Sequence, residues 1–294
     1  MERNLITGRE LEAAELASLL DRADELKRGR AEREGGESLA GLTVALFFER
    51  PSTRTRISFQ VGVTELGGNP LPMRGDELQL GRGESVGDTA RMLSRYVHGV
   101  VVRSGSDELV EELAQEAELP VINGLTPRHH PCQALADLQT LKERFGSTVG
   151  LKVAYVGDGN NVARSLAILG RAAGVEVRVA SPEGYRLEPG LAALDTDDPV
   201  EAAEGADAIY TDVWVSMGDE ATAERRRADF ARFQVNAELL EGASPRAVVL
   251  HCLPAHPGEE ITADVLYGER SAVWDQAENR LHAQKALLEA LLTQ

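Results

Sequence analysis

The sequence Ser-Thr-Arg-Thr-Arg at residues 52–56 decides how the rest of the chain is interpreted. It follows the apolar run Val-Ala-Leu-Phe-Phe at residues 44–48, which is typical of a buried strand. If a helix begins at Ser52, its first N–H groups and the positive end of its dipole favour an anion, and the hydroxyls and guanidiniums of the stretch add donors. The stretch therefore predicts a phosphate site, although a Ser N-cap followed by solvated charges explains the same residues equally well.

The element that comes next is ambiguous. Apolar residues stand at 57, 59, 61 and 63 and alternate with Ser, Gln, Gly and Thr, and this period of two favours a strand. The capping residue that precedes them favours a helix instead. These residues alone leave both alternatives open.

The composition restricts the class of protein. A chain of 294 residues accommodates two domains of ordinary size. Its net charge of −17, from 48 acidic and 31 basic residues, argues against nucleic-acid or anionic-membrane binding as the main activity. The two cysteines suit a reducing compartment, and the sequence shows neither an apolar leader nor a run of about 18 apolar residues, so we expect a cytoplasmic protein.

Strand and helix patterns alternate along the chain, which predicts an α/β protein with largely parallel sheets. Capping-box spacing at Thr7 and Glu10 predicts the start of the first helix, and Asp275 with Glu278 predicts the start of the last. Further helices are expected over 107–117, from Pro131 onward and over 221–233. The main expected strands lie at 44–48, 100–103, 120–122, 151–156, 176–180, 208–212 and 247–250. We predict two doubly wound domains, each with a central mainly parallel sheet flanked by helices, over residues 1–140 and 147–274, and a C-terminal helix at 275–294 that packs back across the domains.

Side chains that can bind or catalyse follow several of these strands, at the edge where open α/β sheets bind ligands. The first domain supplies cationic groups, and the second supplies groups suited to an amino acid. In addition to residues 52–56, these side chains are Arg103, His130, Gln133, Asn160, Asn161, Asp212, Ser216 and Cys252. Each also has an ordinary structural explanation, as an ion pair, a helix cap or a small buried residue. In so acidic a chain, however, a local concentration of Arg and His is better explained by an anionic ligand.

Two other kinds of site are disfavoured. The turn Gly-Asp-Gly-Asn-Asn at 157–161 resembles the start of a dinucleotide fingerprint, but Val162 stands where the third glycine belongs, so an NAD-dependent oxidoreductase is the weaker alternative. His129, His130, His251 and His256 show no recognised zinc spacing, and no Cys pair supports one. We therefore expect neither a metal nor a cofactor.

Four motifs occur together and in order, and they resemble the aspartate/ornithine carbamoyltransferase family. They are Ser-Thr-Arg-Thr-Arg at 52–56, His-Pro-Cys-Gln at 130–133, Asp-Val-Trp-Val-Ser-Met-Gly at 212–218 and His-Cys-Leu-Pro at 251–254. The last two resemble the ornithine-specific branch, because the aspartate branch usually carries His-Pro-Leu-Pro-Arg at the final position. The resemblance runs from the first helix to the last and implies that a helix begins near Ser52.

This resemblance implies an enzyme that transfers the carbamoyl group of carbamoyl phosphate to the side-chain amine of L-ornithine, giving L-citrulline and phosphate in arginine metabolism. It implies an active site in the interdomain cleft, with Arg54, Arg103, His130 and Cys252 as catalytic groups. The implied carbamoyl phosphate ligands are Ser52, Thr53, Arg54, Thr55, Gln79, Arg103, His130, Gln133, Cys252, Leu253 and Arg280. The implied ornithine ligands are Asn161, Asp212, Ser216 and Met217.

The resemblance also implies a homotrimer, in which the glycine-rich loop at 74–87 carries Gln79 to a neighbouring subunit. That loop lacks the lysine of the aspartate branch, and the peptide bond between Leu253 and Pro254 is expected to be cis. Putrescine or N-acetylornithine as the acceptor, and a catalytically silent paralogue, remain open alternatives. Arg56 belongs either to the phosphate site or only to the turn.

Overall fold

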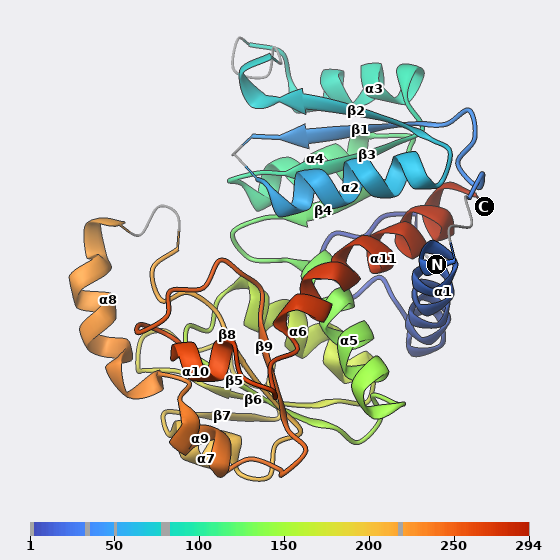
Figure 1. Cartoon of the computed structure of the whole chain (residues 1–294). Helices are drawn as coiled ribbons and strands as arrows, with labels where there is room; N and C mark the ends of the chain where they lie inside the picture. The colour runs from blue at the N-terminus through green and yellow to red at the C-terminus, as the bar shows by residue number, and fades with distance from the viewer. Residues whose placement is uncertain (1–2, 33–35, 50–51, 78–82, 217–219, 294) are drawn as a thin grey trace. The chain divides into compact units, whose positions relative to one another are not determined.

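The computed structural model describes residues 3–32, 36–49, 52–77, 83–216 and 220–293. The chain forms two compact units, Met1–Gln139 with Asn279–Gln294, and Thr140–Glu278 (Figure 1). Two long helices, α5 (Pro131–Phe145) and α11 (Val273–Leu292), contribute residues to both units. No helix of the described residues is long and apolar enough to cross a membrane.

The first unit is built on a four-stranded parallel sheet with the order β2-β1-β3-β4. Its strands are β1 (Thr43–Phe48), β2 (Asn69–Arg74), β3 (Gly99–Arg103) and β4 (Val121–Leu125), and its other helical elements are α1 (Ala13–Ala31), α2 (Arg54–Glu65), the short η1 (Gly75–Glu77), α3 (Val86–Tyr96) and α4 (Asp107–Glu116). Ala45 and Phe47 pack with α3 and α4, while the intervening residues of β1 are equally buried. The apolar run at 44–48 is continuous because both faces of this strand are covered.

The second unit holds a five-stranded parallel sheet with the order β7-β6-β5-β8-β9. Its strands are β5 (Lys152–Val156), β6 (Glu176–Ala180), β7 (Leu194–Thr196), β8 (Ala208–Thr211) and β9 (Val248–His251). Its helical elements are α6 (Asn161–Ala172), α7 (Pro199–Ala203), η3 (Glu220–Thr222), α8 (Ala223–Phe230), η4 (Ala231–Phe233), α9 (Ala237–Glu241) and α10 (Ala263–Leu266). Phe230, Phe233, Leu240 and Leu266 from these helices form one buried cluster with Ile209 of the sheet. The predicted fold class, two domains that each hold a parallel sheet flanked by helices, is therefore confirmed.

The ambiguous segment after Ser52 is a helix, α2. Its buried residues include Thr55, Phe59 and Val63, which recur every four residues on one face, whereas Ile57 is 51% exposed. The apparent period of two arises because apolar residues also occupy the outer face. The helix begins at Arg54 with Thr53 as its N-cap, and no side-chain capping bond is made, so Ser52 is not the cap.

The two predicted capping boxes are wrong in detail. Thr7 N–H does donate to Glu10 Oε1 over 2.9 Å, but in a turn before the helix, and α1 starts at Ala13 with a capping box between Glu12 and Glu15. Asp275 lies in the first turn of α11, because the helical bonds already begin with Gln276 N–H donating to the carbonyl of residue 272. The three-residue edge strand β7 was too short to produce a recognisable pattern.

Candidate functional site

Arg103 lies at the carboxyl end of β3, where the sequence predicted a ligand-binding edge. The parallel register pairs it with Phe48, the last residue of β1, and so brings it next to the start of α2. Its Nη1 donates to Ser52 Oγ over 3.3 Å and to Thr55 Oγ1 over 3.4 Å. The strand end and the helix start therefore form one cluster of donors.

Arg280 reaches the same cluster from α11. Its guanidinium is buried and donates to Gln133 Oε1 over 2.7 Å and to Thr55 Oγ1 over 2.9 Å. Gln133 is held in turn by its own donation to Asp137 Oδ1 over 2.8 Å. Two guanidiniums thus converge on one hydroxyl, and two like charges held this close to a common atom repel each other. A bound dianion would attract both guanidiniums and so offset their mutual repulsion.

His130 precedes α5 and is buried beside these cations. Burial, together with the charges of Arg280, Arg103 and Arg54, lowers its pKa well below the ordinary 6.5. The imidazole is therefore neutral near pH 7 and offers one N–H donor and one acceptor nitrogen. We call Ser52, Thr55, Arg103, His130, Gln133 and Arg280 the cation set.

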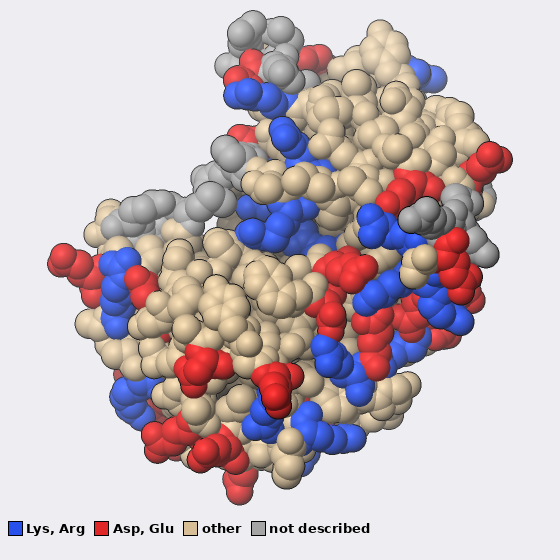
Figure 2. All heavy atoms as spheres, viewed as in Figure 1, with Lys and Arg blue, Asp and Glu red and all other residues tan. Residues whose placement is uncertain are grey.

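The remaining predicted residues of the first unit lie around the cation set or outside the described part. Thr53 and Arg54 are exposed at the start of α2, and Arg54 is close enough to affect the pKa of His130. Arg56 is exposed one position beyond Thr55. Gln79 lies outside the described residues. Figure 2 shows Lys and Arg side chains gathered over the region where α2 begins, whereas acidic and basic side chains alternate over α1 and α11.

In the second unit, Asp212 and Cys252 lie side by side. The register of β8 with β9 pairs Thr211 with His251, so the residue after each strand emerges at the same edge. Cys252 Sγ lies 2.9 Å from Asp212 Oδ1, and the thiol is the donor because a carboxylate only accepts. Asp212 Oδ1 also accepts from Val213 N–H over 2.8 Å. The carboxylate is thus held in one orientation, 7% exposed.

Asn160 holds the other oxygen of this carboxylate. Its Nδ2 donates to Asp212 Oδ2 over 2.9 Å, and its Oδ1 caps α6 by accepting from Val162 N–H and Ala163 N–H over 2.9 and 3.2 Å. The hydroxyl of Tyr155 donates to the same Oδ1 over 3.2 Å. We call Tyr155, Asn160, Asp212 and Cys252 the carboxylate set.

Tyr155 is a residue that the sequence analysis missed. It is fully buried in β5, and burial, followed by the charges of Asp212, Cys252 and Asp158, raises its pKa well above the ordinary 10. It therefore stays protonated and remains a donor. Asn161, the predicted ornithine ligand, is the first residue of α6, directly after Asn160. An Asn before a helix signals a cap, but the sequence gives no sign of a contact with a residue 52 positions away.

Arg226 of α8 was also missed, since a charged helical segment normally faces solvent. It is buried, its Nε donates to the carbonyl of Trp214 over 2.5 Å, and it forms an ion pair with Asp158. Its guanidinium lies 4.9 Å from the centroid of the Tyr185 ring. Arg226 thereby connects the 157–161 turn to the segment leading to Ser216, which is half-buried, while Met217 lies outside the described residues.

The second glycine of the 157–161 turn, Gly159, has a packing explanation. Gly159 N–H donates to the carbonyl of Tyr185 over 2.8 Å, and a Cβ at this position would lie 2.5 Å from that oxygen. Close packing of two backbone segments thus accounts for Gly159 in a pattern that resembled a dinucleotide fingerprint.

The turn that carries Cys252 has the cis peptide bond that was expected, and in addition a residue with positive φ. The peptide bond between Leu253 and Pro254 is cis, and Leu253 has a φ of 58°. His251 Nδ1 accepts from Leu253 N–H over 2.9 Å, so its proton is on Nε2, which lies 3.2 Å from Glu260 Oε1. The buried imidazole of His251 therefore holds the Leu253 backbone in place.

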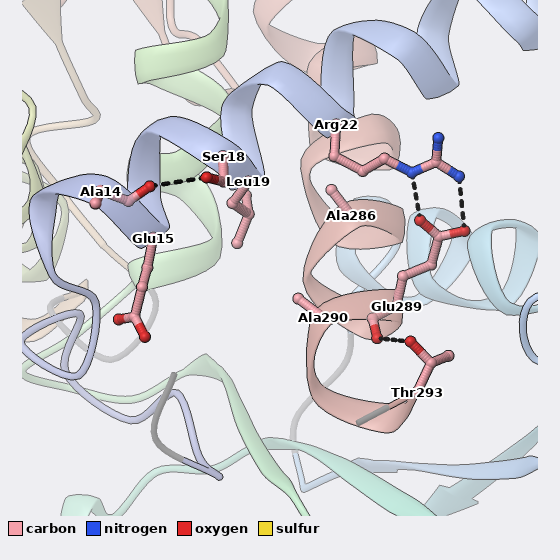
Figure 3. Close-up of a pocket in the computed structure, with 9 residues that line it drawn as sticks. All are labelled: Ala14, Glu15, Ser18, Leu19, Arg22, Ala286, Glu289, Ala290 and Thr293. Carbon is pink, nitrogen blue, oxygen red and sulfur yellow. Dashed lines mark hydrogen bonds and ion pairs between the residues drawn. The ribbon is translucent and has the colours of Figure 1, made fainter.

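A groove of about 500 Å³ between α1 and α11 is separate from both sets. Its lining includes Leu19, Ala286 and Ala290, and the ion pair between Arg22 and Glu289 lies at one side (Figure 3). The groove shares no residue with the cation set or the carboxylate set. Apart from Glu15 and the Arg22–Glu289 ion pair, its lining residues offer no group suited to acid or base chemistry.

Comparison with known proteins covers nearly the whole chain. Residues 3–143 match the family model described as aspartate/ornithine carbamoyltransferase, carbamoyl-P binding domain, and residues 149–291 match the corresponding Asp/Orn binding domain. The ornithine carbamoyltransferase of Bacillus subtilis is 50% identical over 99% of this chain and 94% of its own length. The solved ornithine carbamoyltransferases of Thermus thermophilus and Pyrococcus furiosus are 49% and 48% identical, with TM-scores of 0.92 and 0.95, and cover 99% of this chain and 99% and 97% of theirs.

Proposed function

The chain belongs to the aspartate/ornithine carbamoyltransferase family of enzymes, and from this premise we propose that it transfers the carbamoyl group of carbamoyl phosphate to the side-chain amine of L-ornithine. The products are L-citrulline and phosphate. The observation that supports this most strongly is the convergence of Arg103 and Arg280 on the Thr55 hydroxyl beside neutral His130. Such a cluster of donors is suited to an oxyanion that gains charge during a reaction.

The cation set is proposed to bind carbamoyl phosphate. The start of α2, with Ser52, Thr53, Arg54 and Thr55, would hold the phosphate and stabilise it as it leaves. Arg103, His130 and Thr55 would donate to the carbonyl oxygen. Gln133 and the backbone carbonyls of Cys252 and Leu253 would orient the carbamoyl nitrogen, and Arg280 would complete the pocket. Gln79 would be supplied by a neighbouring subunit of a homotrimer.

The carboxylate set is proposed to bind ornithine. Asp212 would accept from the α-ammonium group, Asn161 would bind the α-carboxylate, and Ser216, Met217 and Cys252 would border the reacting amine. An aspartate acceptor would instead bring its second carboxylate toward Asp212, which like-charge repulsion disfavours. The relatives named as ornithine carbamoyltransferases support the same acceptor.

The reaction needs a neutral amine, whose pKa in water is near that of lysine, about 10.4. Desolvation and nearby cations would lower that pKa on binding. The amine nitrogen then attacks the carbonyl carbon, and the carbonyl oxygen becomes negative beside Arg103 and His130. As the C–O bond to phosphate breaks, phosphate leaves with the bonding electron pair and the amine loses its proton. Cys252 would orient the amine or accept this proton, and no covalent intermediate with the thiol is required.

The cellular setting is part of the proposal. Citrulline formation places the enzyme in arginine metabolism, and the two free cysteines are compatible with a reducing cytoplasm.

A competition assay tests the acceptor. Carbamoyl phosphate is supplied with equal concentrations of ornithine, putrescine, N-acetylornithine and aspartate, and the carbamoylated products are separated and quantified. We expect citrulline to exceed every other product by at least about 100-fold, because a site built for charged groups rejects analogues that leave those groups unpaired. Carbamoyl aspartate or carbamoyl putrescine as the main product would refute the assignment.

A further inference from the structure

A second group of ligand-type side chains lies on the segment that follows the Cys252 turn. One atom each from His256, Glu259 and Glu260 lies within 4.8 Å of the others, and His256 Nδ1 is 3.9 Å from Glu260 Oε2. Exposure of the side chain falls from 50% for His256 through 30% for Glu259 to 0% for Glu260. The His256 end of the group is thus accessible to solvent, whereas the Glu260 end is buried.

The buried glutamate has an oxygen that its surroundings do not satisfy. Glu260 Oε1 accepts from His251 Nε2 over 3.2 Å and from His256 N–H over 2.5 Å. Glu260 Oε2 and Glu259 Oε2 are both buried and have no hydrogen-bond partner among the residues that the structure describes. Buried carboxylate oxygens are normally paired or bound to a metal ion, because their desolvation is costly. Both glutamates belong to the same group as the His256 imidazole.

We propose that His256, Glu259 and Glu260 bind a divalent transition-metal ion of the Zn²⁺ type. One imidazole nitrogen and two carboxylate oxygens suit zinc, cobalt or nickel, whereas magnesium and calcium prefer oxygen ligands alone. Bonds of about 2.0–2.2 Å place tetrahedral ligand atoms roughly 3.4 Å apart, so the observed spacing needs only small side-chain movements. Water would occupy the fourth position on the exposed side.

The partners of the two glutamates would hold them ready for the ion. Glu259 Oε1 accepts from Arg227 Nε over 3.0 Å, and Glu260 Oε1 is held by His251. Such outer contacts orient metal ligands and leave the second oxygen of each carboxylate for the metal. The ion would attach to the same carboxylate that anchors His251 and hence the Leu253 backbone. It takes no part in the proposed transfer reaction.

A second group of side chains in the same unit could bind the same ion. Asp212, His251 and Cys252 also present one ligand atom each within 4.8 Å, and a thiolate binds zinc strongly. The test therefore uses full-length protein in two backgrounds, wild type and Cys252→Ser, because the serine variant removes the thiol. Zn²⁺ is titrated into each background by isothermal calorimetry.

In the Cys252→Ser background we expect one Zn²⁺ per chain, with binding weakened at least about tenfold by His256→Gln and by Glu259→Gln. The matched control His98→Gln removes an exposed histidine of the first unit and should leave the affinity unchanged. In the wild-type background, His256→Gln should keep citrulline formation within about twofold in metal-free buffer. Loss of all Zn²⁺ binding on Cys252→Ser alone, or equal Zn²⁺ affinity with and without His256, would overturn the proposal.

Discussion

The cation set and the carboxylate set are suited to groups of opposite charge. In the cation set, Arg103 and Arg280 bring like charges onto one hydroxyl, and the nearby histidine is kept neutral. In the carboxylate set, the charge of Asp212 is met by donors from Cys252, Asn160 and the Val213 backbone. A bound anion would neutralise the positive charges of the cation set. In the carboxylate set, a donor group of the ligand would have to replace one of the protein donors that contact Asp212. We therefore expect substitutions in the cation set to affect carbamoyl phosphate binding and the chemical step, and those in the carboxylate set to affect acceptor binding.

The largest effect is expected from Arg54→Ala, at the start of α2 beside the cation set. This change removes a charge proposed to stabilise the leaving phosphate, and kcat should fall by about 10³-fold. Arg56→Ala is the matched control, since Arg56 is exposed two positions along the same helix, and its kcat should stay within about threefold of wild type. Equal losses in the two variants would show that general charge, and not the position of Arg54, is responsible.

The next effect is expected from Asp212→Asn. The amide keeps the shape of the side chain but removes the charge proposed to pair with the α-ammonium group. The KM for ornithine should rise by about 100-fold, as for loss of a buried charge-assisted bond. Steady-state kinetics with varied ornithine at saturating carbamoyl phosphate measure this. An unchanged KM with a reduced kcat would place Asp212 in the chemical step instead.

Arg226→Gln should also raise the KM for ornithine, but less than Asp212→Asn does. It removes the ion pair with Asp158 and loosens the segment between Asp212 and Ser216. We expect the KM for ornithine to rise by about tenfold while the KM for carbamoyl phosphate is unchanged. Thermal unfolding of the variant separates this positioning effect from general destabilisation. A parallel rise in both KM values would indicate a purely structural role.

The smallest effect concerns pH. Because the pKa of His130 is lowered below 6.5, the unfolded chain binds this proton first as the pH falls through 6.5. His130 therefore costs stability below that value and none above it. Urea unfolding at about pH 7.5 and about pH 5.5 should show a larger loss of stability for wild type than for His130→Gln. Identical pH dependence of the two proteins would mean that His130 titrates normally.

A feature could be predicted from the sequence where the residues that form it lie close together along the chain. The alternating strands and helices were predictable because burial follows a period along the chain, and the position of Arg103 at the carboxyl edge of the sheet was predictable because it directly ends a strand. The link between Tyr155, Asn160 and Asp212 was not, since it depends on which strands are neighbours in the sheet. The ambiguity at residues 57–63 had the opposite origin, because an exposed apolar residue, Ile57, imitated a strand pattern.

The His256 group shows the same limit. Its spacing corresponds to no recognised zinc pattern, and burial of Glu260 next to His251 is a property of the folded unit alone. The capping boxes failed for a more local reason, since several residues near each helix start could supply the same contact, and Glu12 was used where Thr7 was expected.

The most direct test of the account is whether binding of the two substrates can be separated. Carbamoyl phosphate is titrated by calorimetry into wild type, Arg103→Gln and Asp212→Asn in the absence of ornithine. We predict that Arg103→Gln weakens binding by at least about 100-fold, while Asp212→Asn changes it by less than about twofold. Comparable losses in the two variants would contradict the division between a cation set for carbamoyl phosphate and a carboxylate set for the acceptor.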